Sequence, residues 1–181
     1  MKIKRALLSV WNKDGIIELG QFLANQNIEI LSTGGTKKVL EDAGLDITSI
    51  SFLTGSGAVM DGRVKTLHPK VFGGILADRD NLQHLHDLDY LHGLEIDLVV
   101  VNFYPFVKEA VEKKLEFKRA IEFIDIGGPA MIRAAAKNYH SVLPLCDLGL
   151  YSEFMETFID TDGIIPRDFR KKMAAKVFAM T

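Results

Sequence analysis

Residues 28–36 read Ile-Glu-Ile-Leu-Ser-Thr-Gly-Gly-Thr, an apolar strand-like run that passes directly into a glycine turn (residues 32–36). Val39 and Leu40 then mark a short helix, which we expect to close near Gly44. A turn in this position holds several backbone N–H groups and hydroxyls at the positive end of a helix, where a phosphate can bind. A glycine pair between a strand and a helix can also serve tight geometry alone.

The same alternation of strand-like and helical segments continues on both sides of this stretch. Further strands are predicted at residues 6–10, 47–50, 71–76, 98–101 and 142–145. Helices are predicted at residues 15–25, 82–91, 107–114, 118–123, 129–138, 151–159 and 167–181. The run at residues 98–101 is continuously apolar, as in a central strand that is buried on both faces. The sequence therefore predicts an α/β fold with a largely parallel sheet.

Composition limits the classes of function that the chain can have. With 181 residues and 48% hydrophobic content, it is long enough for one compact domain with a full core. Its 22 basic and 24 acidic residues produce no global field that would attract nucleic acid or an anionic membrane. No apolar run is long enough for a signal peptide or a membrane span, so we expect a cytoplasmic protein. The single cysteine, Cys146, lies in an apolar run and is expected to be buried and unreactive.

The helical and strand periodicity fails between residues 51 and 67, and a loop of this length is usually functional or mobile. Residues 62–69 read Gly-Arg-Val-Lys-Thr-Leu-His-Pro and concentrate two cations, a hydroxyl and an imidazole. In an extended segment Arg63 and Lys65 would point the same way and could converge on one anionic or carbonyl-bearing ligand. The alternative is a solvated basic turn.

Polar residues also follow two predicted strands. Lys13 comes just after the first strand, and Asn102 and Tyr104 close the central one. Ligands of open α/β sheets bind at the carboxyl ends of the strands, so these side chains are candidates for one site. A solvated surface lysine and a tyrosine packed beside Pro105 are the alternatives.

A third candidate segment begins at Asp125 and continues through Gly127-Gly128-Pro129 into a helix. Asp125 could act as acid, base or cap, and the glycine N–H groups could bind a developing oxyanion. Arg133 and Lys137 share one face of this helix, although a lysine on a helix is usually a surface residue. The three histidines at positions 84, 86 and 92 lie among polar residues, and no metal site is expected there.

Together these segments closely resemble the N-terminal domain of the bifunctional enzyme AICAR transformylase/IMP cyclohydrolase of purine biosynthesis. The matching segments are residues 6–10, 32–36, 62–69, 102–106 and 125–138, in the order of the family. The glycine turn alone is shared with methylglyoxal synthase and with the regulatory domain of carbamoyl-phosphate synthetase. The resemblance implies a methylglyoxal-synthase-like fold, which is a Rossmann-type, open, mainly parallel sheet with helices on both faces.

The reaction implied by the resemblance is the dehydrative ring closure of FAICAR, a formylated imidazole carboxamide ribonucleotide, to IMP. A carboxamide nitrogen attacks a formamide carbon, so the site must assist N–H loss, stabilise an oxyanion and protonate the departing oxygen. No electron or hydride moves, so neither a cofactor nor a metal is expected.

The resemblance assigns catalysis to Lys65, Tyr104, Asp125 and Lys137. Our hypothesis is that Asp125, assisted by Lys137, polarises or deprotonates the carboxamide, while Lys65 and Tyr104 stabilise the departing oxygen. The resemblance also assigns phosphate contacts to Lys13, Ser32, Gly34, Gly35 and Thr36, and ribose and base contacts to Ser9, Arg63, Thr66, Asn102, Ile126 and Gly127. Trp11 replaces a small hydroxylic residue that is common in the family, which affects the expected nucleotide contacts.

The resemblance further predicts a cyclohydrolase domain over residues 1–160, then a connector and helix at residues 161–181 that lead toward an absent transformylase domain. Truncation and a standalone cyclohydrolase are both compatible with this expectation. Transformylase activity is not expected from the chain, and the family's homodimer leaves dimerisation of this part open. The rival functions are methylglyoxal synthase, acting on dihydroxyacetone phosphate, and a nucleotide-sensing regulatory domain.

Overall fold

The computed structural model of the protein describes residues 1–181 and contains one five-stranded sheet in the order β3-β2-β1-β4-β5. All four pairs of neighbouring strands are parallel. The strands are β1 (Arg5–Val10), β2 (Glu29–Ser32), β3 (Thr48–Ser49), β4 (Leu98–Asn102) and β5 (Leu143–Leu145). The expected α/β fold with a parallel sheet is therefore confirmed.

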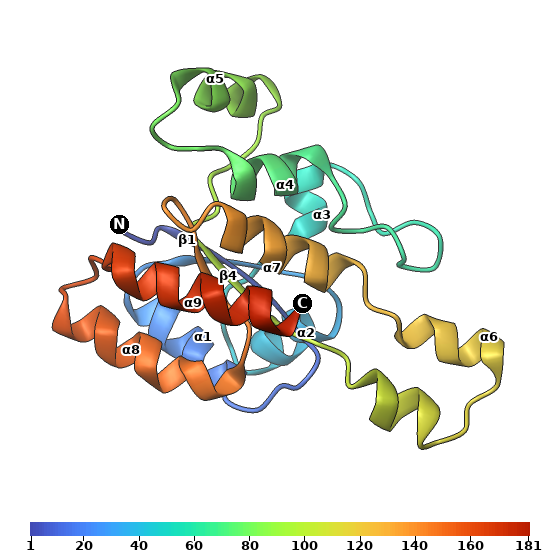
Figure 1. Cartoon of the computed structure of the whole chain (residues 1–181). Helices are drawn as coiled ribbons and strands as arrows, with labels where there is room; N and C mark the ends of the chain where they lie inside the picture. The colour runs from blue at the N-terminus through green and yellow to red at the C-terminus, as the bar shows by residue number, and fades with distance from the viewer.

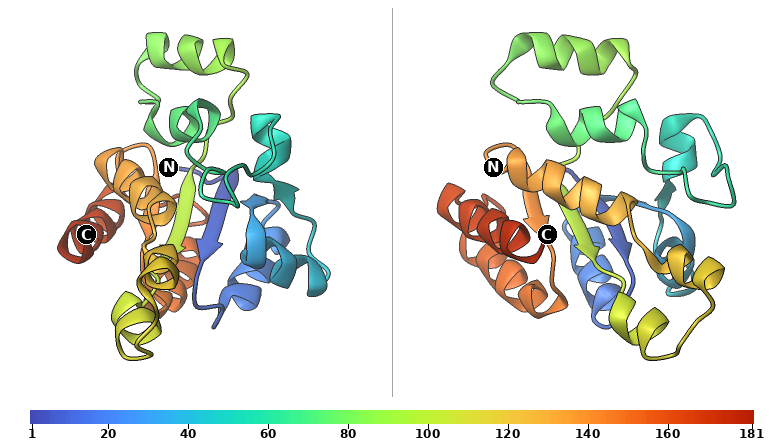
Figure 2. Two further views of the ribbon diagram at one scale, coloured as in Figure 1. Left: turned by 90° about the vertical axis from the view of Figure 1, so that its right-hand side faces the viewer. Right: turned by 45° about the vertical axis from the view of Figure 1, so that its right-hand side comes forward.

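Helices cover both faces of this sheet, as Figure 2 shows. The helices α1 (Ile16–Asn25) and α2 (Gly34–Asp42) pack on β1 and β2, whereas α7 (Gly127–Lys137) and α9 (Arg167–Met180) pack on β4 and β5. The remaining helices are α3 (Ile50–Thr54), α4 (Pro69–Leu76), α5 (Leu82–Tyr90), α6 (Phe117–Ala120) and α8 (Tyr151–Asp160). Three short helical turns complete the chain: η1 (Val107–Val111), η2 (Ile121–Phe123) and η3 (Leu148–Leu150).

The core lies on both faces of the two central strands. All five residues of β4 are buried, as expected for a central strand of a parallel sheet. Ala135 and Ala136 of α7 are fully buried, because their small side chains let this helix approach the sheet closely. Cys146 is also buried, and burial raises the pKa of its thiol, as expected for an unreactive cysteine.

Residues 71–76 are not a strand, as the sequence predicts, but the body of helix α4. A short apolar run fits a buried strand and a buried helix equally well. The residues before this run favour the helix. The Nδ1 of His68 accepts a hydrogen bond from the Lys70 N–H (3.2 Å), and Pro69 occupies the first turn. Val71 and Ile75, four residues apart, then lie buried on one helical face.

The third strand is shorter than expected, because Ser49 ends it and caps the next helix. The Ser49 hydroxyl accepts a hydrogen bond from the Phe52 N–H (3.2 Å), and α3 begins at Ile50. Residues 51–54 are therefore helical, and the irregular loop begins at Gly55.

The C-terminal helix α9 lies alongside α7 and contacts β5 (Figure 1). Its inner face is buried at Met173, Ala174 and Val177. Arg170 fixes the helix further, because its guanidinium donates to the carbonyls of Tyr139 (2.8 Å), His140 (3.0 Å) and Ile165. The helix that the sequence predicts to lead toward a further domain thus packs against the body of this one. No helix in the structure combines the length and the apolarity that crossing a membrane would need.

Residues 103–126, which we call the arm, leave the carboxyl end of β4 and return to the start of α7. The arm contains η1, α6 and η2 and projects from the body at the lower right of Figure 1. It is the segment that brings Tyr104 and Asp125 back to the same edge of the sheet.

The buried phenol of Tyr151 supplies a test of the packing of α8. Burial raises the pKa of Tyr151 from its ordinary value of 10.0 to about 12. The folded state therefore holds this proton more tightly than the unfolded chain, and its stability falls as pH rises through that interval. Over the pH interval between these two pKa values, the unfolding free energy of the wild type should fall by about 2 kcal/mol relative to that of Tyr151→Phe. Urea unfolding at several alkaline pH values measures this, and parallel curves for the two proteins would contradict it.

Candidate active site

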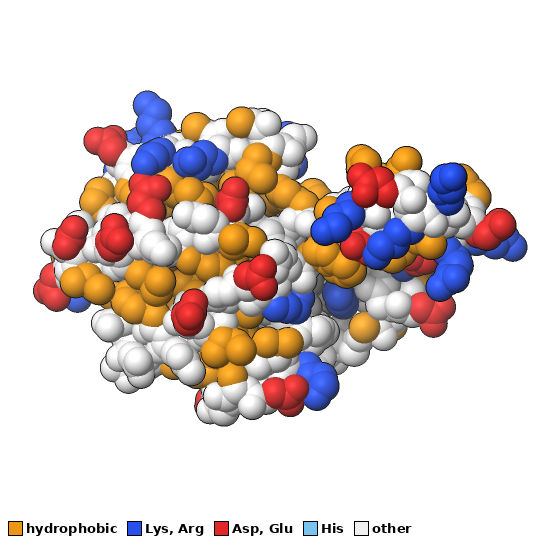
Figure 3. Space-filling model, turned by 90° about the horizontal axis from the view of Figure 1, so that it is seen from below, with side chains coloured by type: hydrophobic (Ala, Val, Ile, Leu, Met, Phe, Trp, Pro, Cys, Tyr) orange, Lys and Arg blue, Asp and Glu red, His pale blue; other side chains and the backbone are white.

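A cavity of about 670 Å³ lies at the carboxyl ends of β1, β2 and β4. Its walls come from the glycine turn, the loop at residues 61–66, the two ends of the arm and the first turn of α7. Figure 3 views the molecule from this end and shows Lys and Arg side chains in the hollow between the arm and the body. All residues that the sequence assigns to the site line the cavity except Ser32, Gly34 and Lys137.

The glycine turn leaves its backbone N–H groups free. Thr33 is the N-cap residue of α2 but its side chain makes no capping hydrogen bond. The Lys37 N–H is the first to bond within this turn, to the Thr33 carbonyl (3.3 Å). The N–H groups of Gly34, Gly35 and Thr36 therefore have no partner in the helix and are available to an anion.

The buried hydroxyls of this turn have a different task. Ser32 is fully buried and donates to the Leu8 carbonyl (2.8 Å). Thr36 donates to the Val10 carbonyl (3.0 Å) and accepts from the Val10 N–H (3.1 Å). Both hydroxyls thus bind the turn to β1, so they position the phosphate-binding backbone rather than offer free donors to a ligand.

Two lysines flank the glycine turn. The Lys65 Nζ lies 3.5 Å from the position that a Cβ would take on Gly34, and the Lys13 Cε lies 4.0 Å from the corresponding position on Gly35. The Lys13 ammonium donates to the carbonyls of Val10 and Trp11. Burial, with a smaller contribution from the charge of Lys65, lowers the pKa of Lys13. An anion between the two ammonium groups would relieve this electrostatic cost.

Asn102 connects the ends of the two central strands. Its Oδ1 accepts from the N–H groups of Trp11 (2.6 Å) and Asn12 (2.9 Å), and its Nδ2 donates to the Asn12 carbonyl (2.8 Å). The side chain lines the cavity, but its amide is occupied by the loop that carries Lys13. Asn102 therefore positions this loop.

The loop at residues 59–64 is a tight hairpin closed by two hydrogen bonds between Val59 and Val64. Its turn places Met60 (φ 54°), Asp61 (φ 55°) and Gly62 (φ 89°) in the left-handed region, which is costly for the two residues that carry a Cβ. Strain of this kind is found at functional sites. The hairpin directs the segment that follows it along the cavity wall.

Arg63 lines the cavity, but its guanidinium is engaged by a carboxylate from the arm. It forms an exposed, two-pronged ion pair with Glu122 of η2. This contact raises the pKa of Arg63 and lowers that of Glu122. Arg63 and Lys65 thus line the same cavity, as the sequence predicts, but Arg63 must leave Glu122 before it can bind a ligand with both arms of its guanidinium.

Asp125 caps the first turn of α7 by accepting a hydrogen bond from the Gly128 N–H at its Oδ1 (3.1 Å). A Cβ on Gly128 would lie 2.4 Å from the Asp125 Oδ2 and 3.1 Å from the Val101 Cγ1. Only glycine leaves room for this carboxylate between α7 and β4. Burial, and then the charge of Asp125, raise the pKa of Tyr104, so that its phenol keeps its proton.

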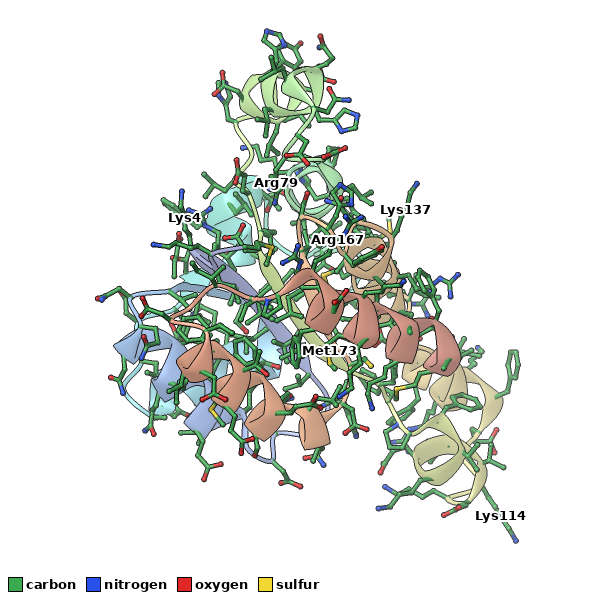
Figure 4. The ribbon with its side chains drawn as sticks, turned by 60° about the vertical axis from the view of Figure 1, so that its left-hand side comes forward. Lys4, Arg79, Lys114, Lys137, Arg167 and Met173 are labelled. Carbon is green, nitrogen blue, oxygen red and sulfur yellow. The ribbon has the colours of Figure 1, made fainter.

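Lys137 is not brought to the cavity. It is the last residue of α7, and its side chain is exposed. Ten residues of helix separate it from Gly127, a rise of roughly 15 Å. Figure 4 shows Lys137 pointing outward from that end of the helix. Within one chain, the cavity therefore gathers Lys65, Tyr104 and Asp125 but not Lys137.

Several cavity residues are absent from the set that the sequence predicts. They are Trp11, Thr33, Asp61, Ile121, Glu122, Ile124 and Met131, among others. Thr33 lies inside the predicted glycine turn, so the motif itself could have pointed to it. Ile121, Glu122 and Ile124 could not be found in this way, because they reach the cavity only when the arm folds back. The structure contains no group of three His, Cys, Asp or Glu side chains that could hold a metal ion.

Comparison with known proteins gives consistent results. The family model of the MGS-like domain matches residues 15–130. The chain is 52% identical over 176 residues to the bifunctional purine biosynthesis protein PurH of Clostridium kluyveri, covering 97% of the chain and 35% of that protein. It is 50% identical over 183 residues to PurH of Rhizobium rhizogenes, covering all of the chain and 34% of that protein. The chain thus spans about a third of the length of the curated relatives it matches.

Among solved structures, a crystal structure of ForH superimposes with a TM-score of 0.85 at 34% sequence identity. The match covers 97% of this chain and 90% of that one.

The close approach at Gly128 leads to a stability test. In Gly128→Ala the added Cβ would displace Asp125 or push α7 away from β4, which should cost about 1–3 kcal/mol of unfolding free energy. Gly57→Ala is the matched control, because a Cβ at Gly57 would meet no atom within 4 Å. The control should stay within about 0.5 kcal/mol of the wild type in urea unfolding. Equal stability of both variants would show that the carboxylate is not held in the way described.

Proposed function

This chain belongs to the MGS-like domain family, and we propose that it is an IMP cyclohydrolase, which closes the second ring of FAICAR to give IMP and water. One observation carries the proposal: Lys65 and, from the two ends of the arm, Tyr104 and Asp125 line the same cavity as the glycine turn. The relatives described above are named as bifunctional purine biosynthesis proteins, which agrees with a purine precursor as the substrate.

The anionic end of the substrate would bind at the glycine turn. Three free N–H groups at the start of α2 and the ammonium groups of Lys13 and Lys65 provide the donors for a phosphate. With the phosphate held there, the ribose and the base would extend toward the arm and α7, where the cavity continues past Ile126 and Gly127.

The reaction itself needs a base and a proton donor on the two sides of the forming bond. We assign the base to Asp125, which would take the proton from the carboxamide nitrogen as that nitrogen bonds to the formyl carbon. The formyl oxygen then becomes an oxyanion and is protonated to a hydroxyl. It leaves as water when it takes a second proton and the former formamide nitrogen gives up its own proton, which forms the C=N bond of the new ring. Tyr104 is suited to donate to this oxygen, because burial and the neighbouring carboxylate keep its phenol protonated. Lys65 cannot serve both ends of the substrate, and its Nζ beside Gly34 assigns it to the phosphate rather than to this oxygen.

The two rival functions require fewer of these features. A methylglyoxal synthase or a nucleotide-sensing domain would use the glycine turn, but neither accounts for Asp125 and Tyr104 beside each other in the same cavity. A cavity of about 670 Å³ is also within the range that holds ligands of nucleotide size.

The direct test supplies the purified chain with FAICAR and follows the ultraviolet absorbance change as the purine forms. We expect turnover by the wild type and a kcat lower by about a hundredfold or more in Asp125→Asn, because the amide cannot accept the proton. Asparagine keeps an oxygen that can accept from the Gly128 N–H, so the fold of the variant should be intact, which circular dichroism verifies. A folded wild type without turnover would refute the cyclohydrolase assignment, and full activity of Asp125→Asn would remove Asp125 from the mechanism.

Lys137 is tested separately, because the resemblance and the geometry lead to different expectations. The exposed position of Lys137 at the far end of α7 predicts a kcat for Lys137→Ala within about threefold of the wild type. Steady-state assays at several protein concentrations measure this. A loss of about a hundredfold would support the catalytic assignment by resemblance and would require another copy of the chain to bring Lys137 to the cavity.

A further inference from the structure

Three aromatic rings meet at the base of the arm, and we call them the three-ring cluster: Trp11, Tyr104 and Phe123. The rings of Trp11 and Tyr104 lie with their centroids 4.2 Å apart at an interplanar angle of 34°. Phe123 packs edge-on against both, with centroid distances of 6.3 Å in each case. Such aromatic pairs contribute beyond the apolar area that they bury.

The cluster joins both ends of the arm to the body. Tyr104 lies where the arm leaves β4, and Phe123 lies where the arm returns, two residues before Asp125. Between these points Ala110 is buried, but the larger apolar side chains of the arm are exposed: Val107, Val111 and Phe117 are 61%, 56% and 78% exposed. Figure 1 shows the arm projecting away from the sheet over this length. The cluster therefore holds the returning end together with the exposed pair of Arg63 and Glu122 and the hydrogen bond from the Gly128 N–H to Asp125.

Trp11 is the member of the cluster that belongs to the body. The backbone N–H of Trp11 donates to the Oδ1 of Asn102 (2.6 Å). This hydrogen bond fixes the loop after β1 to the end of β4. Trp11 and Tyr104 line both the candidate site and a second cavity of about 730 Å³. Since Trp11 and Tyr104 border two cavities, these two rings depend on each other and on Phe123 for their support.

We propose that Trp11 is a positioning residue for the cyclisation, which holds Tyr104 and the segment leading to Asp125 in place by packing against both ends of the arm. This inference rests on the proposed function, since it adds a residue to that same site. Trp11 does not touch the reacting atoms in this assignment. Its contribution is to restrict the arm to the one arrangement in which phenol and carboxylate face a common substrate.

The test compares Trp11→Ala with the conservative variant Trp11→Phe. Removing the ring should lower kcat by about tenfold or more with KM within about threefold, because the glycine turn and its lysines stay in place. Phenylalanine should restore most of the activity. The pH profile of kcat should also change in Trp11→Ala: exposure of Tyr104 lowers the pKa of its phenol toward the ordinary value, so the alkaline loss of activity moves to lower pH.

Phe22→Ala provides the matched control for loss of an aromatic ring. Phe22 packs edge-on against Phe154 and Phe158 in a separate cluster remote from the cavity. This variant should lose thermal stability but retain the kcat and pH profile of the wild type at a temperature where all variants are folded. A fall in kcat of the same size in Phe22→Ala would show that the effect of Trp11→Ala is general destabilisation, and would overturn the proposal.

Hydrogen exchange gives a readout that does not depend on activity. Amides of residues 103–126 should exchange faster in Trp11→Ala than in the wild type, Trp11→Phe or Phe22→Ala. Unchanged exchange in the arm overturns the proposal, and so does faster exchange with unchanged kcat. A wild type that does not convert FAICAR would instead refute the proposed function, while the exchange data would still decide whether Trp11 tethers the arm.

Discussion

The amide of Asn102 makes the contact on which the rest of the site depends. Its three hydrogen bonds to the backbone of Trp11 and Asn12 join the carboxyl ends of the two central strands. This loop carries Lys13 and the ring of Trp11, and Tyr104 lies two residues after Asn102 in the chain. The position of all three side chains therefore depends on these hydrogen bonds. Since a buried donor or acceptor left without its partner costs about 1–3 kcal/mol, the loop has one strongly favoured position. The parallel sheet brings the strands to one edge, and Asn102 sets the geometry there.

Several other features of the cavity are destabilising by themselves, and the packing of the core compensates for them. Two lysines flank one turn, one of them with a lowered pKa, and three N–H groups remain without partners in the helix. Met60 and Asp61 adopt left-handed backbone conformations. The paired lysines and the free N–H groups are the features that a bound anion would satisfy, whereas the core must stabilise the strained hairpin. The fully buried strand β4 and the closely packed helix α7 provide the stability that makes this arrangement possible.

The sequence predicts the parts of the fold in which one local signal dominates. The apolar strands β1 and β4, the glycine turn and the Pro129 helix are all where their patterns place them. The strand predicted at residues 71–76 is wrong, because a run of six residues is too short for its periodicity to separate a helix from a strand. Glu122 could not be predicted as a cavity residue, since its position depends on the path of the arm. For the same reason, the contact of Phe123 with Trp11 has no signature in the sequence.

Lys137 illustrates a different limit, one of helix geometry. Asp125 and Lys137 belong to one continuous motif, and proximity in sequence suggests proximity in space. A site at the N-terminus of a helix, however, can be reached only by the residues before the helix and in its first turns, because each further residue moves about 1.5 Å away along the axis. Gly127, Gly128 and Met131 meet this condition and line the cavity, whereas Lys137 lies at the opposite end. Apart from the glycine turn, the ends of β1 and β4 and the first turns of α7, the cavity is therefore lined by the loop at residues 61–66 and the arm. The precision of the site depends on how firmly these two segments are held to the sheet.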